Sequence, residues 1–406
     1  MPDDEKLVAI RAALPSLAAG IQLNTGSVGP MPAEVAAAMA EIAEYERTVG
    51  RSHPDYHREF LERMDEARAA VAAVLGAEYG SVGLTHAATD GMNIASNGLD
   101  WRPGDVAVTT THEHAGGLGP LYALRERLGV IVRFADIGDG SDDDLTVEAF
   151  DRAIGPGVRL VSLSHVLWTT GAVLPVARIA RLAHERGAIV VVDGAQAVGA
   201  IPVTVGETGA DAYALPAQKW LLGPEGMGAL WISPDVGDRL RPPAAGYHSM
   251  ASYDLHGGVA WHTDGRRFEA AGFHRPSVTG MARAIGWLSM FVGLDFVYRR
   301  GAAMARRAAD ALAGVAGVSV LTPRDGMAGL VTFRIAGWGA AQALEEIAAR
   351  TFAVARTIVA LDALRISVGF FNSEEELDRF VDGVRLIAAH TPATLPSRRT
   401  LTVLGA

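Results

Sequence analysis

Short, almost uninterrupted apolar segments alternate with amphipathic helical segments through the middle of the chain, and this alternation constrains the fold more than any other feature. The apolar segments lie at residues 106–110, 130–134, 160–164, 188–193 and 228–232. A strand that is apolar on both faces has to be covered on both sides, which is typical of parallel sheets flanked by helices. We therefore predict a large α/β domain with a mainly parallel sheet over residues 21–260.

A different pattern follows Pro242-Pro243. The elements expected there are a long helix at 280–312, strands at 318–321, 330–335 and 363–368, and a helix at 340–349. This succession is typical of an α+β arrangement. It predicts a smaller second domain, formed by residues 261–406 together with residues 1–20.

The composition excludes several classes of function. The net charge is −10 and there is no basic tract, which argues against binding to nucleic acid or to an anionic membrane. No segment has the roughly 20 uninterrupted apolar residues of a membrane span, and the acidic N-terminus lacks a signal peptide's apolar stretch, so we expect a cytoplasmic protein. The chain has no cysteine and therefore offers no disulfide, thiolate ligand or thiol nucleophile, and we expect no metal site.

Lys219 is one of only two lysines, the other being Lys6, in a chain whose remaining basic residues are all arginine. A lysine amine can lose its proton, attack a carbonyl and form a Schiff base, whereas a guanidinium stays charged. Residues 214–224 around Lys219 are mostly apolar, and such surroundings lower the pKa of an amine. The alternative is a structural lysine that reaches solvent from a loop.

Asp193 ends the apolar segment 188–193 and precedes Lys219 by 26 residues. A carboxylate held as an anion beside a Schiff-base lysine can keep a pyridine nitrogen protonated, which makes the ring an electron sink. The alternative is an ordinary cap or turn residue after a strand.

Residues 84–93 turn from a strand into a helix and contain several small residues. Backbone amides can approach an anion closely there, and the helix N-terminus adds positive potential. Thr89 would add a hydroxyl, so the segment is a candidate phosphate cradle. An ordinary N-cap is the alternative.

Several short motifs follow one another in a characteristic order. They are Ala87–Asn93, Glu113-His114, Ser164-His165-Val166, Asp193–Gln196, Gln218-Lys219-Trp220, Phe268-Glu269-Ala270 and Arg365-Ile366-Ser367 with its sequel Phe371–Leu377. Over roughly residues 20 to 390, this order and spacing resemble the class V aminotransferase family. The resemblance implies fold type I with a sheet of the seven-stranded type, pyridoxal 5'-phosphate as cofactor, an amino-acid substrate, and a homodimer with residues 268–274 near the subunit boundary.

The resemblance also implies which residues hold the cofactor. They are Lys219 for the Schiff base and the α-proton, Asp193 at the pyridine nitrogen, Gln196 near the phenolic oxygen, His114 stacked on the ring, and Ala88 and Thr89 at the phosphate. Gln218 stands where the family often has a histidine, so that a glutamine amide replaces an imidazole. Pro216 stands where a serine is common, so one hydroxyl contact with the phosphate is lost.

On the substrate side, the resemblance implies that Arg365 clamps the carboxylate through its two-pronged guanidinium. Asn24 and Ser27 resemble the N-terminal segment that lines this side. Trp168 stands where many desulfurases have an asparagine. An indole cannot make the same contact, so we expect the substrate side to differ there.

The reaction is expected to pass through a carbanion at the substrate's α-carbon, which a cationic conjugated ring stabilises. Because the chain has no thiol to receive sulfur, we exclude desulfurisation through a cysteine persulfide. We expect instead a β-elimination that releases sulfur directly, that is, a C–S lyase without a persulfide cysteine.

Three alternatives stay open. An epimerase needs a second acid on the far face, for which His114, Tyr247 and His274 are candidates. An aminotransferase would return the proton to the cofactor. A degenerate family member that only binds or regulates is the non-enzymatic alternative, and the intact lysine and aspartate argue against it.

Overall fold

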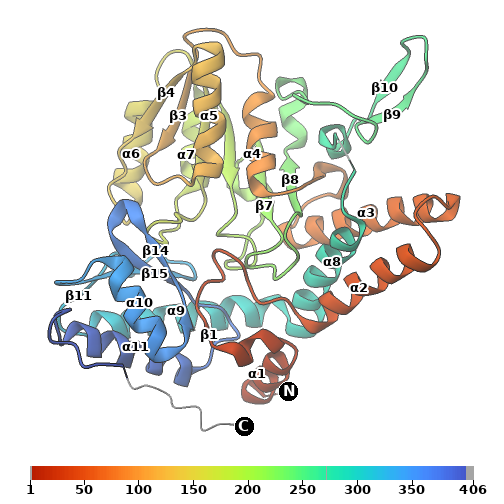
Figure 1. Ribbon diagram of the computed structural model, residues 1–406. Helices are drawn as coiled ribbons and strands as arrows, with labels where there is room; N and C mark the ends of the chain where they lie inside the picture. Colours follow the sequence, from red (N-terminus) through yellow and green to blue (C-terminus); the bar gives the residue numbers. More distant parts are fainter. Residues whose placement is uncertain (1, 271, 399–406) are drawn as a thin grey trace.

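A seven-stranded sheet lies at the centre of the larger part of the molecule, in a computed structural model that describes residues 2–270 and 272–398 (Figure 1). The spatial order of the strands is β2-β8-β7-β6-β5-β3-β4. Their bounds are β2 Val82–Thr85, β3 Val106–Thr110, β4 Ile131–Ala135, β5 Val158–Ser164, β6 Ile189–Asp193, β7 Ala212–Pro216 and β8 Gly228–Ile232. Only β8 runs antiparallel to its neighbours, so the prediction of a mainly parallel sheet is confirmed.

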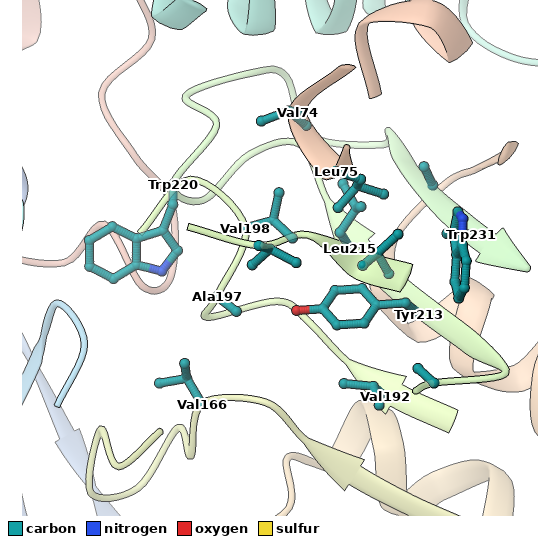
Figure 2. Close-up of a cluster of buried hydrophobic side chains, with 14 of the residues drawn as sticks. Val74, Leu75, Val166, Val192, Ala197, Val198, Tyr213, Leu215, Trp220 and Trp231 are labelled. Carbon is teal, nitrogen blue, oxygen red and sulfur yellow. The ribbon is translucent and has the colours of Figure 1, made fainter. Parts of the chain in front are cut away.

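Helices cover both faces of this sheet, as the apolar strands require. In β6, Ile189 and Val191 belong to the core beneath α4 and α5, whereas Val190 and Val192 belong to the core shared with α3, α6 and α7. The helix bounds are α3 Pro54–Leu75, α4 Ala88–Asn97, α5 Ala115–Leu128, α6 Asp143–Ala153 and α7 Val176–Glu185. Figure 2 shows part of the second core, where Leu215 of the sheet lies near Leu75 of α3 and Val192 lies near Tyr213.

A second, antiparallel sheet in the order β11-β12-β15-β14 lies beside the first (Figure 1). Its strands are β11 Val318–Val320, β12 Leu330–Ile335, β14 Arg356–Ile358 and β15 Ala363–Ser367. The helices around it are α9 Leu294–Ala313, α10 Ala340–Thr351 and α11 Glu374–Ala388. Near the N-terminus, β1 Ile21–Gln22 pairs in parallel with β13 Ala353–Val354. The division into domains at residues 20 and 260 stays a prediction.

The remaining elements flank these two sheets. They are α1 Asp3–Ala12, α2 Ala33–Thr48 and the hairpin of β9 Met250–Tyr253 and β10 Val259–Trp261. The hairpin projects from the body of the molecule (Figure 1), and its tip residue Leu255 is 92% exposed. Residue 271, inside the segment expected near a subunit boundary, lies outside the described residues.

The single helix expected at 280–312 is in fact two. α8 Arg275–Gly286 continues as a π-helical turn, η6 Trp287–Val292, and α9 then begins at Leu294 after a bend of 83°. Gly293 sits at the bend with φ 81°, a left-handed conformation that glycine adopts without strain. Within the described ranges, no single helix is long and apolar enough to cross a membrane, although these two pass that test together as a bent pair.

The turn after β6 is shaped by Tyr213 of β7. A Cβ placed on Gly194 would overlap the Tyr213 ring, so the close approach of ring and backbone requires glycine. Tyr213 is fully buried, and its hydroxyl points toward Ala197 (Figure 2) and lies 2.8 Å from Nδ1 of His165. The ring therefore cannot move aside easily.

We expect Gly194→Ala to destabilise the fold by about 1–3 kcal/mol, because it overpacks this buried contact. Thermal or denaturant unfolding of the purified variant measures the effect. Gly119→Ala is the matched control, since Gly119 lies in α5 with nothing within 4 Å of an added Cβ. The control should unfold like the natural protein or slightly later; equal destabilisation of both variants would contradict the role given to Tyr213.

Candidate active site

The carboxyl ends of the central strands bring the predicted site residues together. Asp193 ends β6 and is paired in register with Ser164 of β5 and Ala214 of β7. Lys219 follows β7 by three residues. In parallel sheets, ligands bind at this edge, where the loops after neighbouring strands meet.

The amine of Lys219 lies in a setting that favours its neutral form. Burial lowers the pKa of this amine to about 8, and the charges of Arg365 and Arg356 lower it as well. The carboxylate of Asp193 acts in the opposite direction. The structure thus places Lys219, Asp193 and Arg365 within electrostatic reach of one another, although they come from three different elements.

Asp193 itself is 6% exposed, and its Oδ1 accepts a hydrogen bond of 2.9 Å from the N–H of Ala195. No side-chain cation forms an ion pair with it among the residues that the structure describes. A buried carboxylate without such a partner is costly, so its site suits a cationic ligand group such as a protonated ring nitrogen.

Gln196 is committed to protein contacts on both sides of its amide. Its Nε2 donates to the carbonyl of Gly26 at 2.8 Å, and its Oε1 accepts from Nε1 of Trp220 at 2.9 Å. One N–H of the amide has no further partner in these contacts, and it is the group that could reach a phenolic oxygen. The contacts also tie the N-terminal segment to the loop that carries Lys219.

His114 is the N-cap of α5, and its Nδ1 accepts a 3.0 Å hydrogen bond from the N–H of Gly116. Burial, and next the charge of Lys219, lower the pKa of His114. Both effects favour the neutral ring, and since Nδ1 accepts a hydrogen bond, a neutral ring carries its proton on Nε2. It meets Trp168 edge to face, with the ring centroids 5.4 Å apart.

The start of α4 has the features of a phosphate cradle. Its N-cap, Ala87, offers no side-chain cap, so the first amides of the helix lack a side-chain acceptor. The Thr89 hydroxyl lies so close to Gly116 that a Cβ there would collide with it, which brings the starts of α4 and α5 together. Ala88 is buried at the same helix start. This arrangement fits an anionic group.

Arg365 lies on β15 of the second sheet, and its guanidinium is the clearest candidate for binding a substrate carboxylate. It is 1% exposed, and burial lowers the pKa of its guanidinium to about 9. Its Nη1 donates to the carbonyl of Trp168 at 2.7 Å, but Nε and Nη2 are buried without a partner. Unpaired donors of a buried cation are costly, so they suit the carboxylate of a ligand.

Further unpaired buried polar atoms lie on residues of the same region. They are Oγ1 of Thr25, Nε1 of Trp168, Oε1 of Gln218 and Oγ of Ser367. Native interiors leave few such atoms without partners. Together with the free donors of Arg365, these atoms fit a polar ligand such as pyridoxal phosphate together with an amino acid.

The sequence analysis missed Arg356. In the antiparallel pairing of β14 and β15, Arg356 lies directly opposite Arg365. Its Nη1 donates to Oγ of Ser27 at 3.2 Å, and its guanidinium lies 5.6 Å from the ring centroid of Trp168. The charge of Arg356 also acts on Lys219, His114 and Arg365. Nothing in the sequence reveals this position without the strand register.

The N-terminal segment contacts residues of the predicted site, and the substrate-lining role of Asn24 and Ser27 stays a prediction. Ser27 donates to Oδ1 of Asn24 at 2.9 Å, and Asn24 forms an isolated bridge with Ser367. Gly29 donates its N–H to the carbonyl of Gln218 at 2.8 Å. By contrast, Tyr247 is 60% exposed and His274 bonds Ser277, and neither acts on the pKa of Lys219.

Comparisons with known proteins agree with this geometry. The family model Aminotransferase class-V matches residues 24–380. A probable cysteine desulfurase of Methanothermobacter thermautotrophicus is 29% identical over 327 residues, which cover 80% of each chain.

Two solved structures of C-DES are also similar, each at 27% identity over 92% of this chain. One is the complex of the cystine C–S lyase C-DES with its reaction product cysteine persulfide; its TM-score is 0.86 and 99% of it is covered. The other is a lysine mutant with glycine covalently linked to its PLP cofactor, with a TM-score of 0.87 and 98% of it covered. These similarities confirm fold type I and pyridoxal phosphate.

The expected reaction, a β-elimination by a C–S lyase without a persulfide cysteine, is contradicted by these comparisons. The relative is named a cysteine desulfurase, and the C-DES complex holds cysteine persulfide as product. The sequence analysis expected the sulfur to leave directly, because the chain has no thiol to receive it. The missing cysteine excludes a persulfide on this chain but not a persulfide on a released product, which needs no protein thiol. The names of this relative and of the two solved structures support neither the epimerase nor the aminotransferase alternative.

We expect the amine of Lys219 to titrate near pH 8 in the cofactor-free protein. An acylating reagent applied over a pH series, with peptide mass spectrometry, measures how the reaction at Lys219 depends on pH. Asp193→Asn should move the midpoint lower, because the carboxylate favours the charged amine. Lys6, the only other lysine, is an internal reference. A midpoint near 10 or higher at Lys219 would contradict the electrostatics described above.

Proposed function

The chain belongs to the class V aminotransferase family and is a pyridoxal-phosphate-dependent lyase, and from this premise we propose that it cleaves the Cβ–S bond of cystine and releases the sulfur in a small-molecule persulfide. The observation that carries the proposal is the pair of facing arginines, Arg365 and Arg356. Cystine has two carboxylates, and the similar protein C-DES is named a cystine C–S lyase.

In this proposal, Arg365 binds the α-carboxylate at the reacting end of the substrate. Its unpaired Nε and Nη2 supply the two parallel donors that a carboxylate accepts. The bond from Nη1 to the Trp168 carbonyl fixes the plane of the guanidinium. Binding then removes the cost of a buried cation with unpaired donors.

Arg356 binds the second carboxylate. It is less buried than Arg365, and Ser27 and the face of Trp168 hold its guanidinium in place. An amino acid with one carboxylate would leave this cation without a partner. Arg356 therefore favours a dicarboxylic substrate over a monocarboxylic one of similar size.

Lys219 carries the proton steps. Since the pKa of its amine is about 8, a sizeable fraction of the free amine is neutral near neutral pH, and such a group can take a proton from the α-carbon. Bound pyridoxal phosphate supplies the conjugated ring that accepts the electron pair left there. His114 and Trp168 border the space beside Lys219 and help to exclude water.

The overall change balances without a thiol on the chain. Cystine and one water give pyruvate, ammonia and cysteine persulfide; the Cβ–S bond breaks, and its electron pair leaves with the sulfur. The second sulfur of cystine carries the released one. Because the sulfur stays on the product, a protein with no cysteine can deliver it.

The proposal includes a homodimer in the cytoplasm. The projecting hairpin β9–β10 supports the dimer, since it exposes Tyr253, Leu255 and Trp261, and exposed apolar patches mark contact surfaces. Sedimentation analysis tests the oligomeric state directly.

The holoenzyme should convert cystine to equal amounts of pyruvate and persulfide. Lactate dehydrogenase coupling measures pyruvate, and cyanide treatment measures the persulfide sulfur as thiocyanate. Lys219→Ala should lose at least about 10³-fold of the rate, because no other amine lies in the site. The matched control Lys6→Ala should keep it. Pyruvate without persulfide sulfur, or no turnover of cystine, would sink the proposal.

Replacing Arg356 should affect KM for cystine alone, whereas replacing Arg365 should affect KM for every amino-acid substrate. Arg356→Gln should raise KM for cystine about tenfold and leave KM for the monocarboxylate S-methylcysteine nearly unchanged, since only cystine has the second carboxylate. Arg365→Gln should raise KM for both substrates by about 100-fold, since both have the α-carboxylate. Steady-state kinetics on the two variants measures this. Equal effects of Arg356→Gln on both substrates would refute its assigned role.

A further inference from the structure

Glu113 is a buried carboxylate that the proposed reaction does not use. It is 5% exposed and lies in the turn between β3 and α5, immediately before His114. Its Oε1 accepts from the Thr110 hydroxyl at 2.8 Å, and its Oε2 accepts from the Ser164 hydroxyl at 2.6 Å. Among residues 2–270 and 272–398, no cation lies within ion-pair distance of it.

Glu113 stands close to the carboxylate of Asp193. Ser164, which donates to Glu113, is the residue paired in register with Asp193 across β5 and β6. Burial raises the pKa of Glu113 to about 7, the Ser164 and Thr110 hydroxyls lower it, and the charge of Asp193 raises it further. Two carboxylates thus share one edge of the sheet. The charge of Asp193 also acts on the amine of Lys219, whose pKa it raises.

A neutral side chain would fill the structural role at lower cost. A glutamine at this position would keep both hydroxyls hydrogen-bonded, whereas an ionised carboxylate has to be desolvated next to a like charge. Both hydroxyls donate to Glu113, which is the arrangement that stabilises the ionised form. A carboxylate retained against this cost points to an electrostatic use.

We propose that Glu113 is a positioning residue for the cofactor, whose charge acts together with that of Asp193 to hold the proton on the pyridine nitrogen. The inference deepens the proposed function and rests on it, with Asp193 facing this nitrogen as the resemblance implies. Two negative charges behind the ring bind its cation more firmly than one. Glu113 therefore strengthens the ring as an electron sink without touching the substrate.

The test is nitrogen NMR of the holoenzyme reconstituted with pyridoxal phosphate that carries ¹⁵N in the ring. The chemical shift reports protonation of this nitrogen directly, over a pH series. Glu113→Gln should lower the midpoint of its titration by about one pH unit, a tenfold change in proton affinity. Ser164→Ala removes a hydroxyl that stabilises the ionised Glu113 and should lower the midpoint by less. This second variant keeps the proposal testable if Glu113→Gln fails to fold.

Asp211→Asn is the matched control. Asp211 is also a buried carboxylate, but it lies before the opposite end of β7 and pairs with His184 and Arg239. Its neutralisation should leave the nitrogen titration unchanged. A Glu113→Gln holoenzyme whose nitrogen titrates like that of the natural protein would overturn the proposal.

A thermal readout tests whether Glu113 carries the electrostatic cost of a buried carboxylate. Because the folded pKa of Glu113 lies above the unfolded value of 4.5, its contribution to stability is present below pH 4.5 and is lost as the pH rises through 7. Glu113→Gln should therefore gain stability relative to the natural protein between pH 5 and pH 8. A structural role predicts an equal loss at every pH. Neither readout needs turnover, so failure of the cystine assay leaves this test intact.

Discussion

The charge balance around Lys219 is the constraint on which the rest of the active site depends. Burial and two guanidinium groups favour the neutral amine, while the carboxylate of Asp193 favours the charged one. Two guanidinium groups near this amine repel each other and any charge on it unless anions join them. A phosphate at the start of α4 and the carboxylates of a substrate are such anions, and they would complete the charge balance of the site.

The fold assembles this arrangement from parts that are distant in the sequence. The central sheet supplies Asp193 and the Lys219 loop, and the second sheet supplies both arginines. Two hydrogen bonds connect the second sheet to the loop after β5 of the central sheet. Nη1 of Arg365 donates to the carbonyl of Trp168, and Oγ1 of Thr332 donates to the carbonyl of Thr169 at 2.7 Å. A shift of the second sheet would therefore move the substrate clamp relative to the amine.

The sequence predicted the parts of the fold and site that local patterns determine. Strand β6 is apolar on both faces, and its end marks Asp193; Lys219 stands out by its rarity. Arg356 could not be predicted, because it faces Arg365 only through a strand register that no local pattern reveals. The bend at Gly293 was missed, since helical periodicity continues on both sides of it. The reaction was misjudged because the absence of cysteine describes only the chain. It says nothing of a persulfide that leaves on a product.

The most direct test of Arg365 and Arg356 as a pair of carboxylate-binding residues is the binding of an uncleavable analogue to the holoenzyme. In 2,7-diaminosuberate, methylene groups replace both sulfurs of cystine, and both carboxylates remain. Isothermal calorimetry would compare it with the same compound lacking the second carboxylate. With Arg365 and Arg356 each holding one carboxylate, the dicarboxylate should bind at least about tenfold more tightly, and added salt should reduce the difference. Equal affinities for the two compounds would contradict a site built for two carboxylates.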